Sequence, residues 1–166
     1  LDKNYKEIFS LNPKVMQHAI IKSIMIKLYF VNKDPEENLI NNNSRAMLNF
    51  GHSIGHSLET FYQYNSRLNH GEAISIGMIT EAIISNKSGY LTNNDLQLII
   101  DHFKKTKLKI KDSNLTNPEI FKILLTDKKN INNKINLILL KKIGLPIINK
   151  EFTKKSLTLF LKKELT

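Results

Sequence analysis

The sequence is 166 residues long, with 41% apolar residues, no cysteine and a formal net charge of +10. This length suits one domain with a hydrophobic core, and the lack of cysteine excludes disulfides and cysteine-based zinc sites. The longest apolar stretch, residues 20–31, is interrupted by Lys22 and Lys27 and falls short of the roughly 20 residues that cross a bilayer. We therefore expect a protein that does not cross a membrane.

The positive charge is spread over the chain rather than concentrated in one segment. Lysines occur in ones and twos, without interleaved aromatic residues or a groove-reading motif, so we do not expect nucleic acid as a partner. A basic cleft for an anionic small molecule fits this charge better. No signal-peptide pattern follows Leu1, and we expect a cytoplasmic protein in which Leu1 is an interior position of a longer chain.

Helix signals dominate the sequence. Asn12 before Pro13 forms a helix start, because the asparagine can cap the helix and proline is well tolerated at its first position. Asn117 and Pro118 repeat this signal, and Gly89 suits a left-handed helix end. We predict a mainly α-helical single domain over residues 1–166, with no interdomain linker. The expected helices span residues 13–31, 45–64, 71–89, 92–105, 117–126 and 153 onward, and residues 135–148 are expected to form a small β-hairpin.

The predicted helix 45–64 concentrates unusual polar residues on one face. At about 100° per residue, a stripe roughly 80° wide contains Arg45, Asn49, His52, His56 and Glu59. Gly51 and Gly55 lie on its flank, where they would admit a neighbouring helix or a ligand, although each costs roughly 1 kcal/mol relative to alanine. An ordinary solvated face would be built from Lys, Glu and Gln, so the stripe indicates a site.

Two histidines one turn apart are a moderate metal signal. His52 and His56 can point the same way, but a metal ion needs at least one more ligand. His70 is the candidate, because a short connection would bring it back alongside the first helix. Glu72 is better placed to steady a histidine ligand, or to favour the start of the next helix through its charge, than to bind metal itself.

Four segments, in this order along the chain, resemble the 3-dehydroquinate synthase family and cover nearly the whole sequence. They are Ile26-Lys27 with Asp34-Pro35-Glu36-Glu37; residues 45–56, with Arg45, Asn49, His52 and His56; residues 70–78, beginning His-Gly-Glu-Ala; and Asp127-Lys128-Lys129-Asn130 with Ile143-Gly144 behind it. The resemblance implies the C-terminal, metal- and substrate-binding half of a dehydroquinate synthase-like fold, a multi-helix domain with a small β-hairpin near its C-terminus.

The resemblance also implies an activity. The family converts 3-deoxy-D-arabino-heptulosonate 7-phosphate to 3-dehydroquinate and phosphate in the shikimate pathway, and its NAD is reduced transiently and regenerated. By this resemblance His52 and His70 would be zinc ligands, and His56 and Glu37 would have acid/base roles. Cobalt would satisfy the same ligand geometry. The substrate-binding residues implied are Lys27, Arg45, Asn49, Lys128 and Lys129.

The same resemblance implies partners outside this chain. An N-terminal NAD-binding α/β domain, absent from this sequence, would supply a glutamate as the third metal ligand, and the family suggests a homodimer. The asparagine-rich loop leaves open whether Glu37 or Glu36 is the family acid. Which of Lys128 and Lys129 faces the substrate is also open.

Three alternatives stand beside this interpretation. Another sugar-phosphate cyclase would share the helices and differ mainly at substrate-contacting positions. A metal-dependent polyol dehydrogenase would not need so many anion-binding groups. A non-catalytic helical module would place the histidines at an interface, and measurement of bound metal would separate it from the enzymes.

Overall fold

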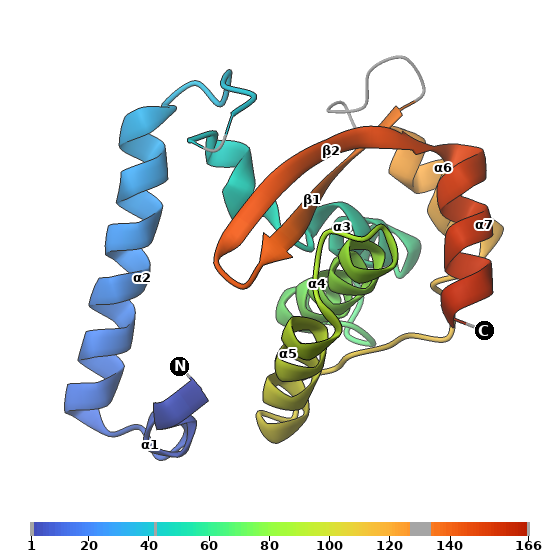
Figure 1. Cartoon of the computed structure of the whole chain (residues 1–166). Coiled ribbons are helices and arrows are strands. Elements are labelled where there is room, and N and C mark those ends of the chain that lie inside the picture. The colour runs from blue at the N-terminus through green and yellow to red at the C-terminus, as the bar shows by residue number, and fades with distance from the viewer. Residues whose placement is uncertain (1, 42, 127–133, 166) are drawn as a thin grey trace. The chain divides into compact units, whose positions relative to one another are not determined.

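The computed structural model describes residues 2–41, 43–126 and 134–165, which divide into two compact units, residues 1–48 and 49–166 (Figure 1). Most described residues are helical, and one antiparallel pair of strands lies near the C-terminus. The predicted fold class is therefore confirmed. Among the helices of these ranges, none combines the length and the hydropathy of a membrane span.

The first unit contains a long helix that begins where the sequence predicts. After α1 (Tyr5–Phe9), helix α2 (Pro13–Lys33) starts with Asn12 as its cap. The Asn12 side chain accepts hydrogen bonds from the backbone N–H groups of Lys14, at 3.2 Å, and Val15, at 3.3 Å. Proline at the first helical position leaves no N–H to satisfy, so local chemistry explains this start.

A single buried carboxylate organises the loop that follows α2. Asp34 accepts hydrogen bonds from the backbone N–H groups of Asn38 at 2.8 Å, Leu39 at 3.2 Å and Arg45 at 2.9 Å. Burial acts to raise the pKa of Asp34, but these bonds, with a contribution from Ser44, outweigh it and hold the pKa below its ordinary value. The asparagine-rich loop is thus folded around an ionised side chain.

The prediction of one continuous helix from Arg45 to Tyr64 is wrong. Residues Arg45–Asn49 form a 3-10 helix, η2, and a separate helix α3 spans His52–Phe61. Between them Gly51 adopts a left-handed conformation, with φ of +83°, which an α-helix cannot continue through. Arg45 and Asn49 therefore do not share a helix with the histidines, and the predicted stripe is reduced to the α3 residues His52, His56 and Glu59.

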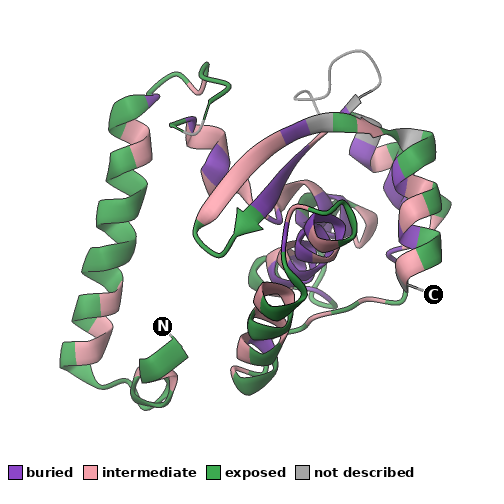
Figure 2. Ribbon diagram, in the orientation of Figure 1, coloured by how far each residue is buried: buried purple, intermediate pink, exposed green. Residues whose placement is uncertain are grey.

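Helices α3 and α4 (His70–Lys87) pack very closely, and α4 is buried along most of its length (Figure 2). A Cβ atom added to Gly55 would lie 2.7 Å from Cδ1 of Ile74, and one added to Gly77 would collide with the carbonyl oxygen of Gly51. The glycines thus allow the close approach that the sequence predicts. A neighbouring helix occupies the space beside Gly51 and Gly55.

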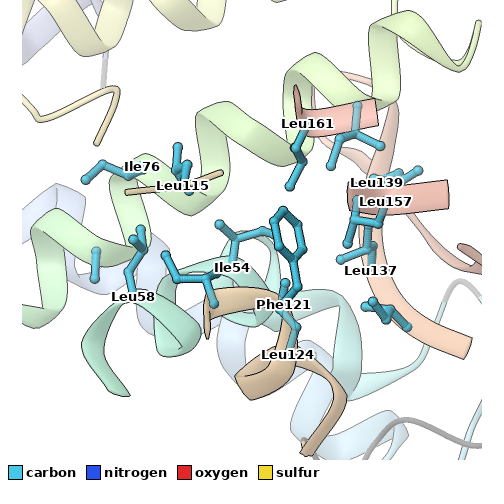
Figure 3. Packing of buried hydrophobic residues seen from close by; sticks show 14 of the residues in the cluster. Ile54, Leu58, Ile76, Leu115, Phe121, Leu124, Leu137, Leu139, Leu157 and Leu161 are labelled. Atoms are coloured by element: carbon cyan, nitrogen blue, oxygen red, sulfur yellow. The ribbon is translucent and has the colours of Figure 1, made fainter. Parts of the chain in front are cut away.

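The second unit has a main hydrophobic core (Figure 3) and a smaller cluster on which α5 (Asn93–Lys105) packs. Helices α5 and α6 (Pro118–Thr126) precede the hairpin of β1 (Lys134–Lys142) and β2 (Leu145–Thr153), and α7 (Lys154–Leu165) follows it. Fully or nearly fully buried core side chains come from α3, α4, α6, β1 and α7: Ile54, Leu58, Ile76, Phe121, Leu137, Leu139, Leu157 and Leu161.

Local signals also predicted these later elements. Thr92 caps α5 by accepting from the N–H of Asp95 at 3.1 Å, and Thr153 caps α7 by accepting from Ser156 at 3.2 Å. Gly89, just after α4, has a φ of +78°. The helix boundaries and the hairpin are confirmed, and both strands extend a few residues beyond the predicted range.

Candidate metal centre

Three histidine rings, two from α3 and one from the start of α4, meet beside the crossing of these helices. The centroid of the His52 ring lies 5.2 Å from that of His56 and 6.0 Å from that of His70, and the His56 and His70 centroids are 5.9 Å apart. Since an imidazole nitrogen binds zinc at about 2.0–2.1 Å, rings at these separations are close enough to share one ion. The structure therefore brings together the three histidines that the sequence singles out.

A buried carboxylate supports one of these rings. Nδ1 of His70 lies 3.0 Å from Oε1 and 3.1 Å from Oε2 of Glu59. Glu59 is only 7% exposed. A carboxylate that accepts the Nδ1 proton fixes the ring and leaves Nε2 for a metal, which is the usual arrangement around histidine ligands. The sequence placed Glu59 on the polar stripe but did not reveal that it partners His70.

A group of possible metal-ligand atoms at this site includes Glu59 itself. Among the described residues, ligand atoms of His56, Glu59 and His70 all lie within 4.8 Å of one another. Two imidazoles and a carboxylate form a donor set that zinc uses in proteins, so the residues present fit such an ion. His52 lies beside this set, with Nδ1 at 3.3 Å from the carbonyl oxygen of Phe50. The assignment of His52 and His70 as ligands, and of His56 to proton transfer, stays a prediction.

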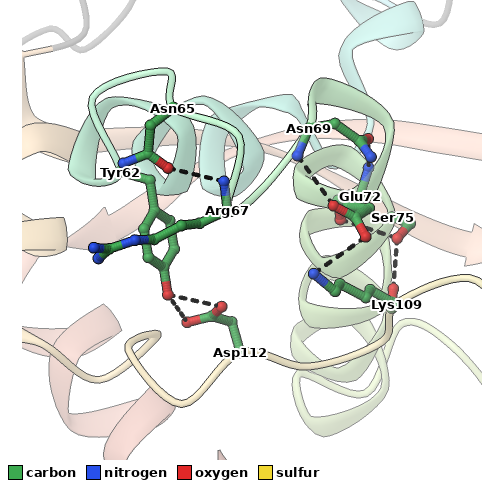
Figure 4. A network of polar contacts seen from close by, with 8 residues as sticks. All are labelled: Tyr62, Asn65, Arg67, Asn69, Glu72, Ser75, Lys109 and Asp112. Atoms are coloured by element: carbon green, nitrogen blue, oxygen red, sulfur yellow. Dashed lines mark hydrogen bonds and ion pairs between the residues drawn. The ribbon is translucent and has the colours of Figure 1, made fainter.

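Glu72 favours the start of α4, which is the second of the two roles predicted for it. It forms a reciprocal capping box with Asn69, with bonds of 2.9 and 3.0 Å, and pairs with Nζ of Lys109 at 3.1 Å (Figure 4). The Asn69 backbone N–H, and then Lys109, hold the pKa of Glu72 below its ordinary value. Its charge thus favours the start of α4, while Glu59 supports the histidine.

Further polar contacts tie both helices to the segment between α5 and α6. The Tyr62 hydroxyl donates to Asp112 at 3.1 Å, and Ser75 of α4 donates to the carbonyl oxygen of Lys109 (Figure 4). The same hydroxyl accepts from Nδ2 of Asn114 at 2.7 Å. Tyr62 directly follows α3 as its C-cap, so these contacts hold the end of α3 and the start of α4 on the same support. The geometry of the histidines therefore depends on this framework.

Three of the predicted substrate and acid/base residues belong to the first unit. Lys27 is exposed on α2. Nη1 of Arg45 donates to the carbonyl oxygen of Pro35 at 3.0 Å, which orients the guanidinium. Glu37 is half-buried with a φ of +55°, whereas Glu36 is exposed. Their roles toward a substrate stay predictions.

The other predicted substrate-binding residues are Asn49, Lys128 and Lys129. Asn49 is half-buried at the end of η2, two residues before the left-handed Gly51. Lys128 and Lys129 lie outside the described residues.

Solved structures identify the class of fold. The chain matches a 2-epi-5-epi-valiolone synthase from Streptomyces hygroscopicus, solved with NAD+ and Zn2+ bound, with a TM-score of 0.75 over 98% of this chain and 46% of that one, at 20% identity. It also matches a 2-deoxy-scyllo-inosose synthase complexed with carbaglucose-6-phosphate, NAD+ and Co2+, with a TM-score of 0.58 over 72% of this chain and 35% of that one, at 24% identity. The fold is that of one part of these synthases.

Sequence comparison identifies the family. The family model described as 3-dehydroquinate synthase C-terminal matches residues 1–130. The 3-dehydroquinate synthase of Pelagibacter ubique is 38% identical over all of this chain and 45% of its own length, and that of Thermodesulfovibrio yellowstonii is 37% identical over 95% of this chain and 43% of its own length. The chain belongs to the 3-dehydroquinate synthase family and spans less than half the length of these relatives.

Proposed function

We propose that this chain is the metal- and substrate-binding part of a 3-dehydroquinate synthase. The whole protein converts 3-deoxy-D-arabino-heptulosonate 7-phosphate to 3-dehydroquinate and phosphate in the shikimate pathway, with NAD and zinc or cobalt as cofactors. The observation that carries this proposal is the three-histidine cluster, supported by the buried carboxylate of Glu59, in a chain of this family. Two solved relatives of the same fold hold NAD+ with Zn2+ or Co2+.

His52 and His70 hold the metal ion in this proposal. When bound, the ion polarises the substrate hydroxyl that is oxidised and lowers its pKa. Glu59 keeps the His70 ring in the orientation that presents Nε2. A carboxylate from an N-terminal NAD-binding domain completes the ligand set, since the relatives are more than twice as long as this chain. The whole protein is a cytoplasmic homodimer.

His56 and Glu37 move protons in this proposal. An ordinary imidazole exchanges protons near neutral pH, and His56 is exposed beside His52 and His70, where a substrate can reach it. Glu37 is the second acid/base group.

A substrate that carries both a carboxylate and a phosphate needs several cations and hydrogen-bond donors at fixed positions. The groups that serve this purpose are Lys27, Arg45, Asn49 and the pair Lys128-Lys129.

An activity assay on the full-length protein tests the proposed function. Phosphate release from 3-deoxy-D-arabino-heptulosonate 7-phosphate should require both NAD and zinc, and 3-dehydroquinate should accumulate in equal amount. A sugar phosphate without the carboxylate, such as glucose 6-phosphate, should release little phosphate. Turnover of glucose 6-phosphate alone would assign the protein to another cyclase, and no phosphate release from either compound would reject the proposed chemistry.

Glu59→Ala is expected to weaken zinc binding by about ten- to hundredfold, the range for loss of a carboxylate that orients a histidine ligand. Glu59→Gln keeps an oxygen that accepts the His70 Nδ1 proton. If Glu59 acts through His70, this variant should therefore lose much less affinity for zinc than Glu59→Ala. Calorimetric titration of the metal-free protein with zinc measures both variants. An equally large loss in Glu59→Gln would show that Glu59 binds the ion directly.

Arg45→Ala is expected to weaken substrate binding by about ten- to hundredfold, because a charge-assisted contact to an anionic group contributes roughly 1.5–3 kcal/mol. The affinity for NAD should stay close to that of the unaltered protein. Titrations with substrate and with NAD separate the two effects, and Arg67→Ala is the matched control because Arg67 is the other arginine of the chain. An equal loss for NAD would place Arg45 in a different subsite.

A further inference from the structure

Helix α4 carries a buried acidic residue that the proposed chemistry does not use. Glu81 is 0% exposed, and its Oε2 accepts a hydrogen bond from the backbone N–H of Gly51 at 2.7 Å. Its Oε1 is buried without a hydrogen-bond partner among the described residues. A buried carboxyl group is costly unless its contacts compensate for lost hydration, so a specific role is expected for this side chain.

Glu81 supplies the cap that α3 cannot provide for itself. The first backbone N–H groups of a helix have no partner within it, and the N-cap residue of α3 is Gly51, which has no side chain. The Glu81 carboxyl binds the Gly51 N–H and also interacts with the N–H of Ile54 in the first turn. Burial raises the pKa of Glu81 well above its ordinary value, although these two N–H groups act in the opposite direction.

The contact with Glu81 is one of the polar contacts that hold α3 on α4 among the described residues. At the start of α3, Gly51 binds Glu81; near its end, Glu59 binds His70 at 3.0 Å. His70 and Glu81 are eleven residues apart on α4, about 16 Å along a helix, so the two helices run antiparallel and are fixed at separated points. Because His52 directly follows Gly51, the contact with Glu81 lies next to the histidine cluster.

We propose that Glu81 is a positioning residue: by binding the start of α3 to α4 it sets the placement of His52 and His56 relative to His70. This proposal rests on the proposed metal-binding function. It differs from a general role in core packing, because it requires the carbonyl-type oxygen at the end of the side chain rather than its volume. A variant that keeps this oxygen should therefore preserve the metal centre.

Three substitutions at this position test the requirement. Glu81→Gln keeps an oxygen for the Gly51 N–H, and its amide nitrogen replaces Oε1, which has no hydrogen-bond partner among the described residues. Glu81→Ala removes the oxygen. Glu81→Asp keeps a carboxyl group but shortens the side chain by one methylene, so it cannot reach Gly51 in the same way; it serves the test if the alanine variant does not fold.

The readouts are the affinity of the full-length protein for Co2+ and the visible absorption spectrum of the bound ion. Glu81→Ala and Glu81→Asp should weaken Co2+ binding by about ten- to hundredfold, as loss of ligand support does, and should change the spectrum. Glu81→Gln should bind with nearly the original affinity and spectrum. Unaltered binding in the alanine or aspartate variant, or a loss in Glu81→Gln as large as in these two, would overturn the proposal.

Ser85→Ala is the matched control on the same helix. The Ser85 hydroxyl donates to the backbone carbonyl oxygen of Glu81 at 2.6 Å and accepts from the backbone N–H of Leu140 at 2.9 Å. Its loss therefore destabilises the contact of α4 with β1 without removing a contact to α3. This control should lower stability but keep the Co2+ spectrum. A spectrum altered as strongly as in Glu81→Ala would overturn the proposal.

Amide hydrogen exchange separates failure of this proposal from failure of the proposed function. In Glu81→Ala, exchange at Gly51 and Ile54 should accelerate at least tenfold relative to the unaltered protein, whether or not metal binds. If the unaltered protein binds no metal, the proposed function fails, and accelerated exchange then supports only the anchoring of α3 by Glu81. Unaltered exchange at these two amides would overturn the anchoring as well.

Discussion

Replacement of His52 and His70 together by alanine is expected to abolish tight zinc binding by the full-length protein. Both rings lie in the cluster, with centroids 6.0 Å apart, and their removal would take away the two imidazole ligands proposed for the ion. Loss of a residue that only supports a ligand costs about ten- to hundredfold in affinity, so loss of two ligands should exceed hundredfold. Zinc retained after dialysis against a weak chelator, measured by atomic absorption, checks this outcome.

A control and a single variant make this experiment decisive. His18→Ala removes an exposed histidine of α2 and should leave one zinc per chain. His56→Ala should retain zinc but lose activity if His56 moves protons. Zinc retained by the His52 and His70 double variant would contradict the metal assignment. Zinc lost in His56→Ala would instead favour the set of His56, Glu59 and His70.

The parts of the fold that could be predicted are those in which one or two neighbouring residues decide the backbone. Asn12 and Thr92 cap their helices through their own side chains, and Gly89 takes the left-handed conformation after α4. In each case the hydrogen-bond partner lies within three residues, or the backbone angle depends on the absence of Cβ. Sequence pattern contains all the information needed for such features.

The break between η2 and α3 could not be predicted in this way. Helical periodicity continues from Arg45 through Gly51, and the pattern predicts the glycine as a point of close approach within one helix. The approach is real, but a buried acid thirty residues later also binds the Gly51 N–H, and this contact exists only in the folded chain. One signal was present: Glu81 is the only acidic residue between Ala73 and Ser85 of a strongly apolar helix.

In the candidate site, too, features set by local spacing could be predicted, whereas features set by tertiary packing could not. Spacing along the chain predicted that His52, His56 and His70 would meet, because a helix turn and a short connection limit where each ring can lie. The support of His70 by Glu59 depends on how α3 packs on α4, and sequence spacing did not separate Glu59 from Glu72 in this role. Resemblance to a family suggested roles for these residues, whereas the contacts that hold the rings in place came from tertiary structure.

Gly77→Ala is expected to have the largest effect on stability of any single methyl group added to α4. The new Cβ would collide with the backbone carbonyl of Gly51 and lie 2.9 Å from the backbone nitrogen of Gly55. Backbone atoms cannot move aside as a flexible side chain does, so the cost should reach the upper end of overpacking effects, about 3 kcal/mol. The midpoint of thermal unfolding should then be about 6–12 °C lower, from the usual scaling for chains of this size.

Gly71→Ala provides the matched comparison, since it adds the same methyl group to the same helix six residues earlier. Its Cβ would meet only Oδ1 of Asn69, at an ordinary 3.5 Å, so the better helix propensity of alanine should stabilise α4 by about 0.5–1 kcal/mol. Gly77→Ala should also weaken zinc binding, because separation of α3 from α4 moves His52 and His56 away from His70. Equal thermal midpoints for the two variants would show that the crossing of α3 and α4 is looser than these contacts require, and the histidine cluster would then lack the rigid support inferred for it.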